Sequence, residues 1–231
     1  MKVIGLIGGM SWESSVLYYQ ILNRKTREIL GGSHSSECLM YSVDFGEIAL
    51  LQHQGDWETL EKKMIAAAQR LERGGADIVL ICTNTMHKMA EAIEQNINIP
   101  LLHIVDSTAA EIQKKSYTKL GMLATQFSME EDFLKKRYKT KYGIEITVPE
   151  EDQRNEVHRI IYEELVKGII KESSKQYYLK VIGELVKNGA EAIILGCTEI
   201  ELLIKQGDVS IDLFATAQIH AENAVEWALT S

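Results

Sequence analysis

Two stretches of this chain, residues 75–85 and 189–199, end in side chains that can move a proton or bind an anion. Their sequences, GADIVLICTNT and GAEAIILGCTE, are near copies: small residues, an acid, an apolar strand and a polar end. Aligned without a gap, they pair Thr83 with Cys197, 114 residues later, and Cys82 with Gly196. A thiol can act as a general base, and nearby donors can hold a carboxylate. Together, the two ends suit a reaction in which a proton leaves one face of a carbon and arrives at the other.

Cys197 is the strongest catalytic candidate because helix-forming residues 199–204 follow its strand directly. Backbone N–H groups and the dipole at a helix N-terminus favour a thiolate over a thiol. A buried packing role is the alternative, since free cysteine is often buried. The match to the first stretch favours the catalytic interpretation.

The partner of Cys197 is either Thr83 or Cys82. Side chains alternate across a strand, so both cannot point into the same cleft if the strand stays regular to its end. The alignment favours Thr83 and assigns Cys82 to the core, unless a bend in the loop presents Cys82 instead.

Further candidates lie beside strand ends and helix starts, where hydroxyl, amide and backbone N–H donors suit a carboxylate. They are Asn84, Thr85, Thr198, and the turn residues Met10 and Ser11 after the first strand. Helix capping is the structural alternative for the polar ones. A second echo, residues 2–9 against 119–125 at an offset of 116, adds Thr125 at its end. The opening GLIGGM lacks the GxGxxG spacing, so a dinucleotide site has weak support.

Composition bounds the function classes. With 231 residues and 45% hydrophobic residues, the chain can bury a substantial core. A net charge of −8 argues against nucleic acid as a partner. No apolar run reaches the roughly 20 residues of a membrane helix, so we expect no membrane partner and a cytoplasmic location. Three cysteines without CxxC spacing indicate neither a disulfide framework nor a zinc site. We expect no cofactor and no metal.

The elements that position these residues alternate between strand and helix, which predicts an α/β fold with parallel sheets. Strands are expected at 2–8, 37–44, 77–82, 99–105, 118–124, 144–148 and 191–196, with helices at about 12–30, 56–73, 86–95, 107–115, 129–141, 153–171, 174–188, 199–205 and 216–229. We predict a first domain of residues 1–105 plus 214–231 and a second domain of 106–213. Two similar halves could then face each other across one cleft.

Three motifs, in this order, resemble those of the aspartate/glutamate racemase family of cofactor-independent amino acid racemases, in its aspartate-racemase-like branch. They are IGGM at 7–10, NTMH at 84–87 and GCTEI at 196–200. Glu199 follows the Cys-Thr pair, where glutamate racemases usually carry histidine. It is a further candidate site residue, either hydrogen-bonded near Cys197 or simply the first-turn acid that the helix dipole favours. The resemblance implies two similar Rossmann-like α/β domains related by a pseudo-twofold axis, an active site in the cleft between them, and a homodimer.

The resemblance also implies roles for individual residues. Cys197 would act on the L-enantiomer of the substrate, a small-molecule amino acid, and Lys167 would hold its distal carboxylate. Gln52 stands where aspartate racemases carry arginine, which would relax specificity for acidic substrates. Thr83 stands where the family has its first catalytic cysteine, and Ser11-Trp12 replaces a common Gly-Pro.

We therefore expect a racemase of aspartate or glutamate, with Cys197 as base and reprotonation from the Thr83 or Cys82 face. Two alternatives remain open. One is a related isomerase or decarboxylase of small dicarboxylates, and the other is a non-catalytic amino acid binding module.

Overall fold

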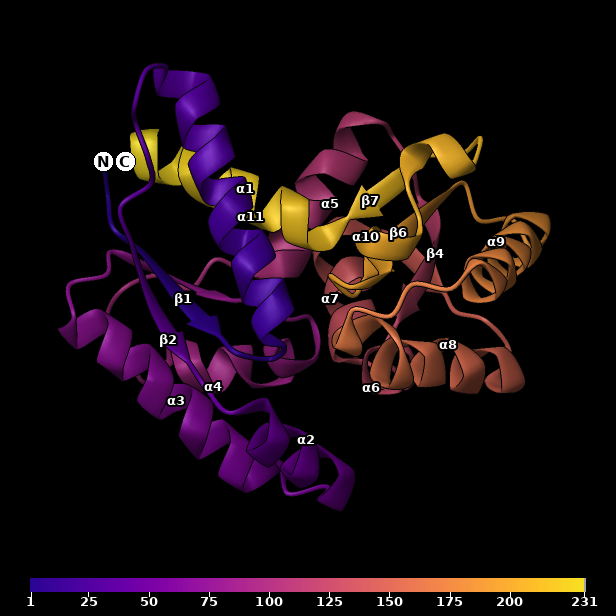
Figure 1. Ribbon diagram of the computed structural model, residues 1–231, viewed down its shortest axis with the longest axis horizontal. Helices are drawn as coiled ribbons and strands as arrows, with labels where there is room; N and C mark the ends of the chain where they lie inside the picture. The colour runs from indigo at the N-terminus through magenta and orange to yellow at the C-terminus, as the bar shows by residue number, and fades with distance from the viewer. Residues whose placement is uncertain (231) are drawn as a thin grey trace. The chain divides into compact units, whose positions relative to one another are not determined.

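Seven strands form two parallel sheets in the computed structural model, which describes residues 1–230 (Figure 1). The strands are β1 (Ile4–Gly8), β2 (Cys38–Ser42), β3 (Ile78–Ile81), β4 (Lys119–Ala124), β5 (Glu145–Thr147), β6 (Ala192–Gly196) and β7 (Leu213–Ala215). One sheet has the order β2-β1-β3 and the other β5-β4-β6-β7. Helices connect the strands, as parallel pairing requires. The predicted α/β class with parallel sheets is confirmed.

One or more helices separate consecutive strands along the chain. They are α1 (Trp12–Leu30), α2 (Phe45–Gln54), α3 (Trp57–Arg73), α4 (Ala90–Glu94), α5 (Ile104–Lys114), α6 (Gln126–Glu130), α7 (Phe133–Tyr142), α8 (Glu151–Glu163), α9 (Glu172–Lys187), α10 (Ile200–Leu203) and α11 (Thr216–Thr230). Short 3-10 helices add η1 (Thr85–Met89), η2 (Leu165–Lys167) and η3 (Gln206–Asp208).

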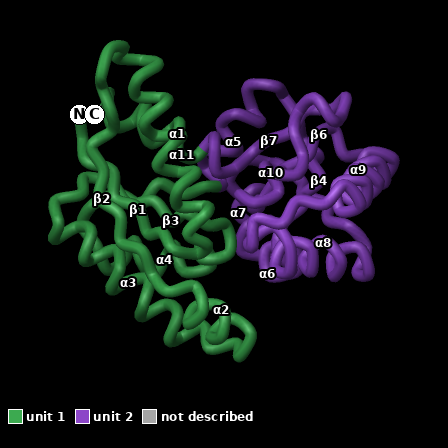
Figure 2. Tube along the Cα trace, in the orientation of Figure 1, with its two compact units in different colours: residues 1–104, 220–231 green, residues 105–219 purple. Residues whose placement is uncertain are grey.

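The chain divides into two compact units, each built around one sheet (Figure 2). Unit 1 contains residues 1–104 and the segment from residue 220 onward, and unit 2 contains residues 105–219. The sequence predicts crossings between the domains near residues 105 and 213. In this division the chain enters unit 2 after Ile104 and returns to unit 1 after Ile219, so β7, which pairs with β6, lies inside unit 2.

Helices cover both faces of the unit 1 sheet. On one face, Val79 and Ile81 pack in a cluster with Met64 of α3 and Ile93 of α4. Because side chains alternate across a strand, Cys82 belongs to the opposite face. That face is covered by α1 and α11 (Figure 1).

A side-chain hydrogen bond links helices α1 and α11 within unit 1. The hydroxyl of Tyr18 on α1 lies 2.9 Å from Nδ1 of His220 on α11. Near the chain ends, the amide of Lys2 donates to the carbonyl of Ala228 at 2.9 Å. The two ends of the described chain therefore lie in the same unit.

The two sheets reproduce the internal repeat in their register. Gly5 of β1 lies opposite Val79 of β3, and Gly121 of β4 lies opposite Ile193 of β6. These partners are separated by the two offsets of the sequence alignment, 116 residues from β1 to β4 and 114 from β3 to β6. The strand ends that precede the aligned polar residues are therefore equivalent.

The acids of the repeat have a structural role. The Asp77 carboxylate accepts a hydrogen bond from the Val3 amide at 2.6 Å. Glu191 accepts from the amides of Thr118 and Lys119 at 2.7 and 2.9 Å. Each carboxylate satisfies backbone donors at the amino edge of its sheet, away from the edge with the polar strand ends.

Several predicted elements differ in the structure. The strand expected at 99–105 is reduced to an isolated bridge between Leu101 and Val79, because α5 already begins at Ile104. Helix α2 and strand β7 are present although the sequence pattern predicts neither. The long helices expected at 129–141 and 153–171 are interrupted, the second ending at Glu163 before η2.

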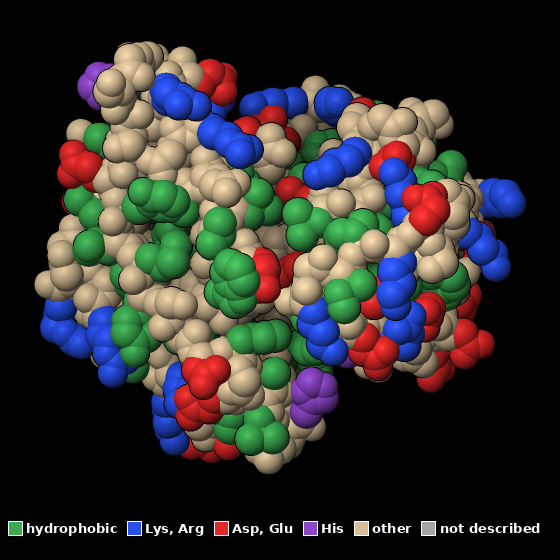
Figure 3. Space-filling view, in the orientation of Figure 1, with side chains coloured by type: hydrophobic (Ala, Val, Ile, Leu, Met, Phe, Trp, Pro, Cys, Tyr) green, Lys and Arg blue, Asp and Glu red, His purple; other side chains and the backbone are tan. Residues whose placement is uncertain are grey.

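No helix within residues 1–230 is both long and apolar enough to cross a bilayer. On the face of the molecule shown in Figure 3, lysine and arginine side chains lie among aspartate and glutamate side chains.

Candidate active site

In unit 1, the polar residues follow the carboxyl ends of two adjacent strands. Since β1 and β3 are parallel neighbours, the turns after them open at the same edge of the sheet. Gly9 shapes the first turn with φ +89°, and a Cβ there would lie 2.2 Å from the carbonyl oxygen of Val43. Its amide donates to Oγ of Ser15 at 2.7 Å. Ser11 begins α1 by accepting from the Ser14 amide at 3.3 Å, which confirms it as the N-cap.

Cys82 and Thr83 follow β3 in different environments. Cys82 is fully buried, and burial is the main cause that raises the pKa of its thiol. Thr83 is half-buried, and its carbonyl oxygen lies 2.8 Å from Nδ1 of His87. By its position after β3, Thr83 corresponds to Cys197 after β6.

Four further predicted residues of unit 1 are buried. Thr85 begins η1, and Asn84 is the residue before it, whose side chain makes no capping hydrogen bond to η1. Gln52 is 5% exposed, and its Nε2 lies 3.4 Å from Sδ of Met86 on η1, so α2 places Gln52 beside the loop after β3. Met10 packs in the hydrophobic cluster of the α3 face.

In unit 2, Cys197, Thr198 and Glu199 form a hydrogen-bonded group directly after β6. The Cys197 thiol donates to Oε2 of Glu199 at 3.0 Å, and the Thr198 hydroxyl donates to the same oxygen at 2.7 Å. All three residues are buried. The carboxylate is therefore placed to take the thiol proton.

The surroundings of Cys197 oppose the thiolate that its position before a helix predicts. Burial first, and then the nearby Glu199 carboxylate, raise the pKa of the thiol well above its usual value. The following helix, α10, has only four residues, which is a short dipole to oppose these effects. When protonated, the thiol is held by its hydrogen bond to the Glu199 carboxylate.

Thr125 follows β4, the neighbour of β6, at the same edge. Its hydroxyl lies 3.3 Å from that of Ser128. The next amide, of Gln126, donates to Nδ1 of His158 on α8 at 3.1 Å. One turn further along α8, burial and the nearby Cys197 and Glu199 raise the pKa of Tyr162.

His158 and Tyr162 were missed by sequence reasoning. Their rings lie 4.5 Å apart between centroids. Their i, i+4 spacing is visible in the sequence and could have indicated a shared helix face at the site. Such pairs also occur in ordinary helix cores, so the spacing alone does not identify a site.

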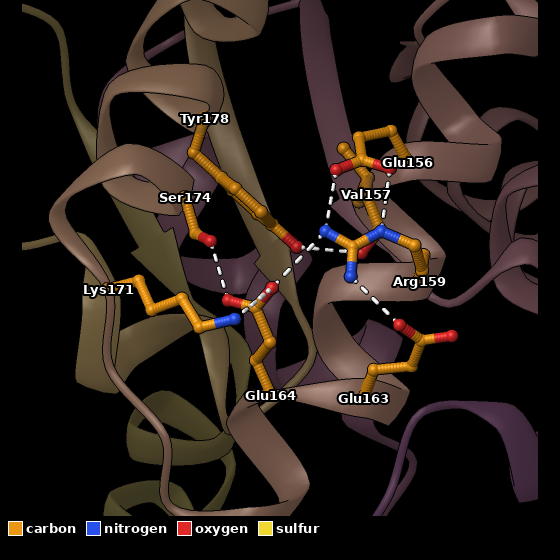
Figure 4. Close-up of polar contacts among 8 residues, drawn as sticks. All are labelled: Glu156, Val157, Arg159, Glu163, Glu164, Lys171, Ser174 and Tyr178. Atoms are coloured by element: carbon orange, nitrogen blue, oxygen red, sulfur yellow. Dashed lines mark hydrogen bonds and ion pairs between the residues drawn. The ribbon is translucent and has the colours of Figure 1, made fainter.

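Lys167 lies exposed at the end of η2, which packs against α10 after Cys197. Figure 4 shows how its loop is held: Glu164, just before η2, contacts Arg159, Lys171 and Ser174. The Glu164 carbonyl accepts from the Lys167 amide at 3.0 Å. The backbone of this loop is therefore held in place by Glu164, although the Lys167 side chain is solvent-exposed.

Each unit carries its own set of predicted residues, most of them just after the carboxyl ends of its strands. Unit 1 carries Met10, Ser11, Gln52, Cys82, Thr83, Asn84 and Thr85, and unit 2 carries Thr125, Lys167, Cys197, Thr198 and Glu199. A groove of about 390 Å³ beside β2 is lined by none of them, so chemistry and not cavity size identifies the candidate site. Within residues 1–230, no group of three or more His, Cys, Asp or Glu residues is arranged to hold a metal ion.

Comparisons with known proteins agree with these motifs. A family model described as Asp/Glu/Hydantoin racemase matches residues 7–224. The broad specificity amino-acid racemase RacX of Bacillus subtilis is 23% identical over 230 residues, which are 96% of each chain.

Two crystal structures are more similar in sequence. A candidate Asp/Glu racemase from Yersinia pestis is 47% identical, with a TM-score of 0.93 and 100% of both chains covered. An aspartate racemase homologue from Pyrococcus horikoshii is 37% identical, with a TM-score of 0.87, covering 99% of this chain and 100% of that one. The chain therefore belongs to the Asp/Glu/Hydantoin racemase family.

Proposed function

We propose that this protein is a cofactor-independent amino acid racemase that acts on aspartate or glutamate. The observation that carries the proposal is the Cys197 thiol 3.0 Å from the Glu199 carboxylate, at a strand end equivalent to the one before Thr83. A thiol paired with its own proton acceptor can serve as a base although its resting pKa is high.

Proton abstraction starts at Cys197. As Glu199 accepts the thiol proton, the sulfur takes the α-proton of the L-substrate, and the C–H electron pair stays on the substrate as a carbanion. Racemisation at one carbon requires that the Cys197 edge and the Thr83 edge act on the same substrate molecule. The family resemblance supports L-substrate at the Cys197 side.

Charge on the carbanion spreads into the α-carboxylate, where hydrogen-bond donors stabilise it. Asn84, Thr85 and Thr198 are the proposed donors because each is buried just after the carboxyl end of a strand of its sheet. Preorganised donors in a water-poor site stabilise developing charge better than water does.

The Thr83 hydroxyl, or a water bound to it, returns a proton to the opposite face of the carbanion. The oxygen left negative takes a proton from solvent and Glu199 releases its proton to solvent, which restores the starting state. Cys82 is the less suitable group because it is fully buried on the α1 and α11 side of the sheet. A hydroxyl is a weak base, so the reaction starting from the D-substrate is slower at saturation. Since the enantiomers have equal free energy, kcat/KM must still match in the two directions, and the asymmetry resides in compensating kcat and KM.

Substrate choice rests on Lys167 and Gln52. Lys167 is the proposed contact for the distal carboxylate, supported by the packing of η2 against α10. An amide at Gln52 attracts that carboxylate less than arginine would, which favours a broader substrate range. The broad-specificity relative in Bacillus subtilis is consistent with that breadth.

The test is α-proton exchange in D2O followed by NMR, with chirality measured in parallel, for L- and D-aspartate and glutamate. Exchange with inversion in the wild type, abolished in Cys197→Ala, is the expected result. Stabilisation by amino acids without any exchange would instead indicate a binding module. Turnover of a small dicarboxylate without amino acid exchange would indicate the related isomerase or decarboxylase.

We also propose that the two units are the catalytic domains of a cytoplasmic homodimer. Trp12, Val16 and Tyr19 form an exposed stripe on α1, with exposed fractions of 65%, 43% and 51%, and such patches commonly mark interfaces. The free thiols Cys38, Cys82 and Cys197 suit a reducing compartment. Light scattering of wild type and Trp12→Glu tests the dimer, and cell fractionation tests the location.

A further inference from the structure

His87 uses both of its ring nitrogens to bridge two backbone segments of unit 1. Its Nε2 accepts from the amide of Ile104 at 3.2 Å, and its Nδ1 lies 2.8 Å from the carbonyl oxygen of Thr83. An amide only donates and a carbonyl only accepts, so the proton must sit on Nδ1. His87 is therefore a neutral tautomer selected by its two partners, and it is 3% exposed.

Ile104 is the first residue of α5, the helix by which the chain leaves unit 1. First-turn amides of a helix have no partner within the helix. His87 supplies a hydrogen-bond acceptor for the Ile104 amide. It lies on the loop that carries Thr83, four residues after Thr83. The position of that loop is thus tied to the start of α5.

Glu201 occupies the corresponding place in unit 2. It lies 114 residues after His87 and four residues after Cys197, the same spacings as in the internal repeat. Its carboxylate accepts hydrogen bonds from the amides of Ala217 and Gln218, in the first turn of α11. That helix is the one by which the chain leaves unit 2.

The register of the sheets supports this equivalence. Leu101 is bridged to Val79, three residues before α5 begins, and Leu213 pairs with Ile193, three residues before α11 begins. Each exit helix therefore starts at the same distance after its strand contact. In unit 2 the Glu201 side chain is 9% exposed, comparable to His87.

A second histidine fixes the exit segment of unit 1. His220 Nε2 lies 2.9 Å from the carbonyl oxygen of Leu102, and its Nδ1 lies 2.9 Å from the Tyr18 hydroxyl. Burial lowers the pKa of His220 to about 4, so the ring is neutral and Nε2 donates. The exit segment is held at Leu102 by one imidazole and at Ile104 by the other.

We propose that His87 and Glu201 are equivalent positioning residues, each fixing one catalytic loop to the helix by which the chain leaves that unit. His87 acts on the Thr83 loop, and Glu201 acts on the Cys197 loop. This inference rests on the proposed function, because it takes Thr83 and Cys197 as the proton-transfer positions. Small displacements of such groups are costly, with losses of about 100-fold for roughly 1 Å.

Paired variants separate the two bonds of His87. Asn keeps a donor at the Nδ1 position for Thr83 but loses the acceptor for Ile104, and Gln keeps that acceptor but loses the donor. Each variant is expected to lower inversion of the L-substrate by roughly 10- to 100-fold. Exchange of the L-substrate α-proton at Cys197 stays within about twofold, because that face is untouched.

His53→Gln is the matched control. His53 also places Nδ1 near the carbonyl four residues earlier, at 2.7 Å from Ala49, but it is exposed. We expect it to leave exchange and inversion unchanged. In unit 2, Glu201→Gln keeps an acceptor and retains exchange, whereas Glu201→Leu lowers exchange and inversion together.

Two results would overturn the assignment. One is full inversion in both His87 variants, and the other is an equal loss of exchange and inversion in them, which would indicate a general loss of structure. The tautomer provides a test that needs no activity: 15N NMR of the wild-type imidazole should show the proton on Nδ1 of His87, and a proton on Nε2 would exclude the bridge. Absence of exchange in the wild type with the expected tautomer would reject the proposed function alone.

Discussion

Glu201→Gln should lose less stability than the wild type as the pH rises from 5 to 8. The Glu201 carboxyl is buried, and burial is the main cause that raises its pKa from 4.5 to about 7. Its Oε1 has no hydrogen-bond partner within residues 1–230. Glutamine preserves the acceptor for Ala217 and Gln218 but does not ionise.

The sign of the pH dependence follows from the raised pKa. Between pH 4.5 and 7 the folded protein keeps a proton on Glu201 that the unfolded chain releases, so the free energy of unfolding falls as the pH rises through that window. Each pKa unit corresponds to about 1.4 kcal/mol. From pH 5 to pH 8 the wild type should lose roughly 2–3 kcal/mol more than Glu201→Gln.

Urea unfolding of both proteins at pH 5 and pH 8 measures this difference. Any constant effect of the amide, such as an unpaired NH2 group, cancels because only the change with pH is compared. Other titrating groups cancel for the same reason. Parallel pH dependences, within about 0.5 kcal/mol, would refute the buried ionisation of Glu201.

Three further predictions concern the site loops. Thr83→Cys should raise kcat for D-substrate, because a thiol is a better base than a hydroxyl; no change, together with a strong loss in Cys82→Ala, would move the role to Cys82. Lys167→Ala should raise KM for aspartate by roughly two- to fivefold, as for an exposed charge pair, with little change for a neutral amino acid. An unchanged preference would remove Lys167 from the site. Gly9→Ala should lower the free energy of unfolding by more than about 2 kcal/mol, because its Cβ would meet the Val43 carbonyl, whereas Gly31→Ala, also at positive φ but with open space, costs about 1 kcal/mol. Equal losses in a denaturant titration would contradict that steric account.

The amino-acid sequence alone determined the fold class, the family and the internal repeat. Strand periodicity and glycine signals are local, so they can be recognised without tertiary information. The offsets of 114 and 116 residues can be read from the sequence, and the same offsets relate the paired strands of the two sheets. The short elements α2 and β7 were not predicted because they lack a long periodic pattern.

The tertiary structure decided the chemistry of the individual groups. Burial and the Glu199 carboxylate raise the pKa of the Cys197 thiol, although its place before a helix had suggested a thiolate. The bridge from His87 to Ile104 and the cap from Glu201 to α11 join residues that sequence distance keeps apart. Protonation and positioning depend on which groups are buried together, and that is set by packing and not by local pattern.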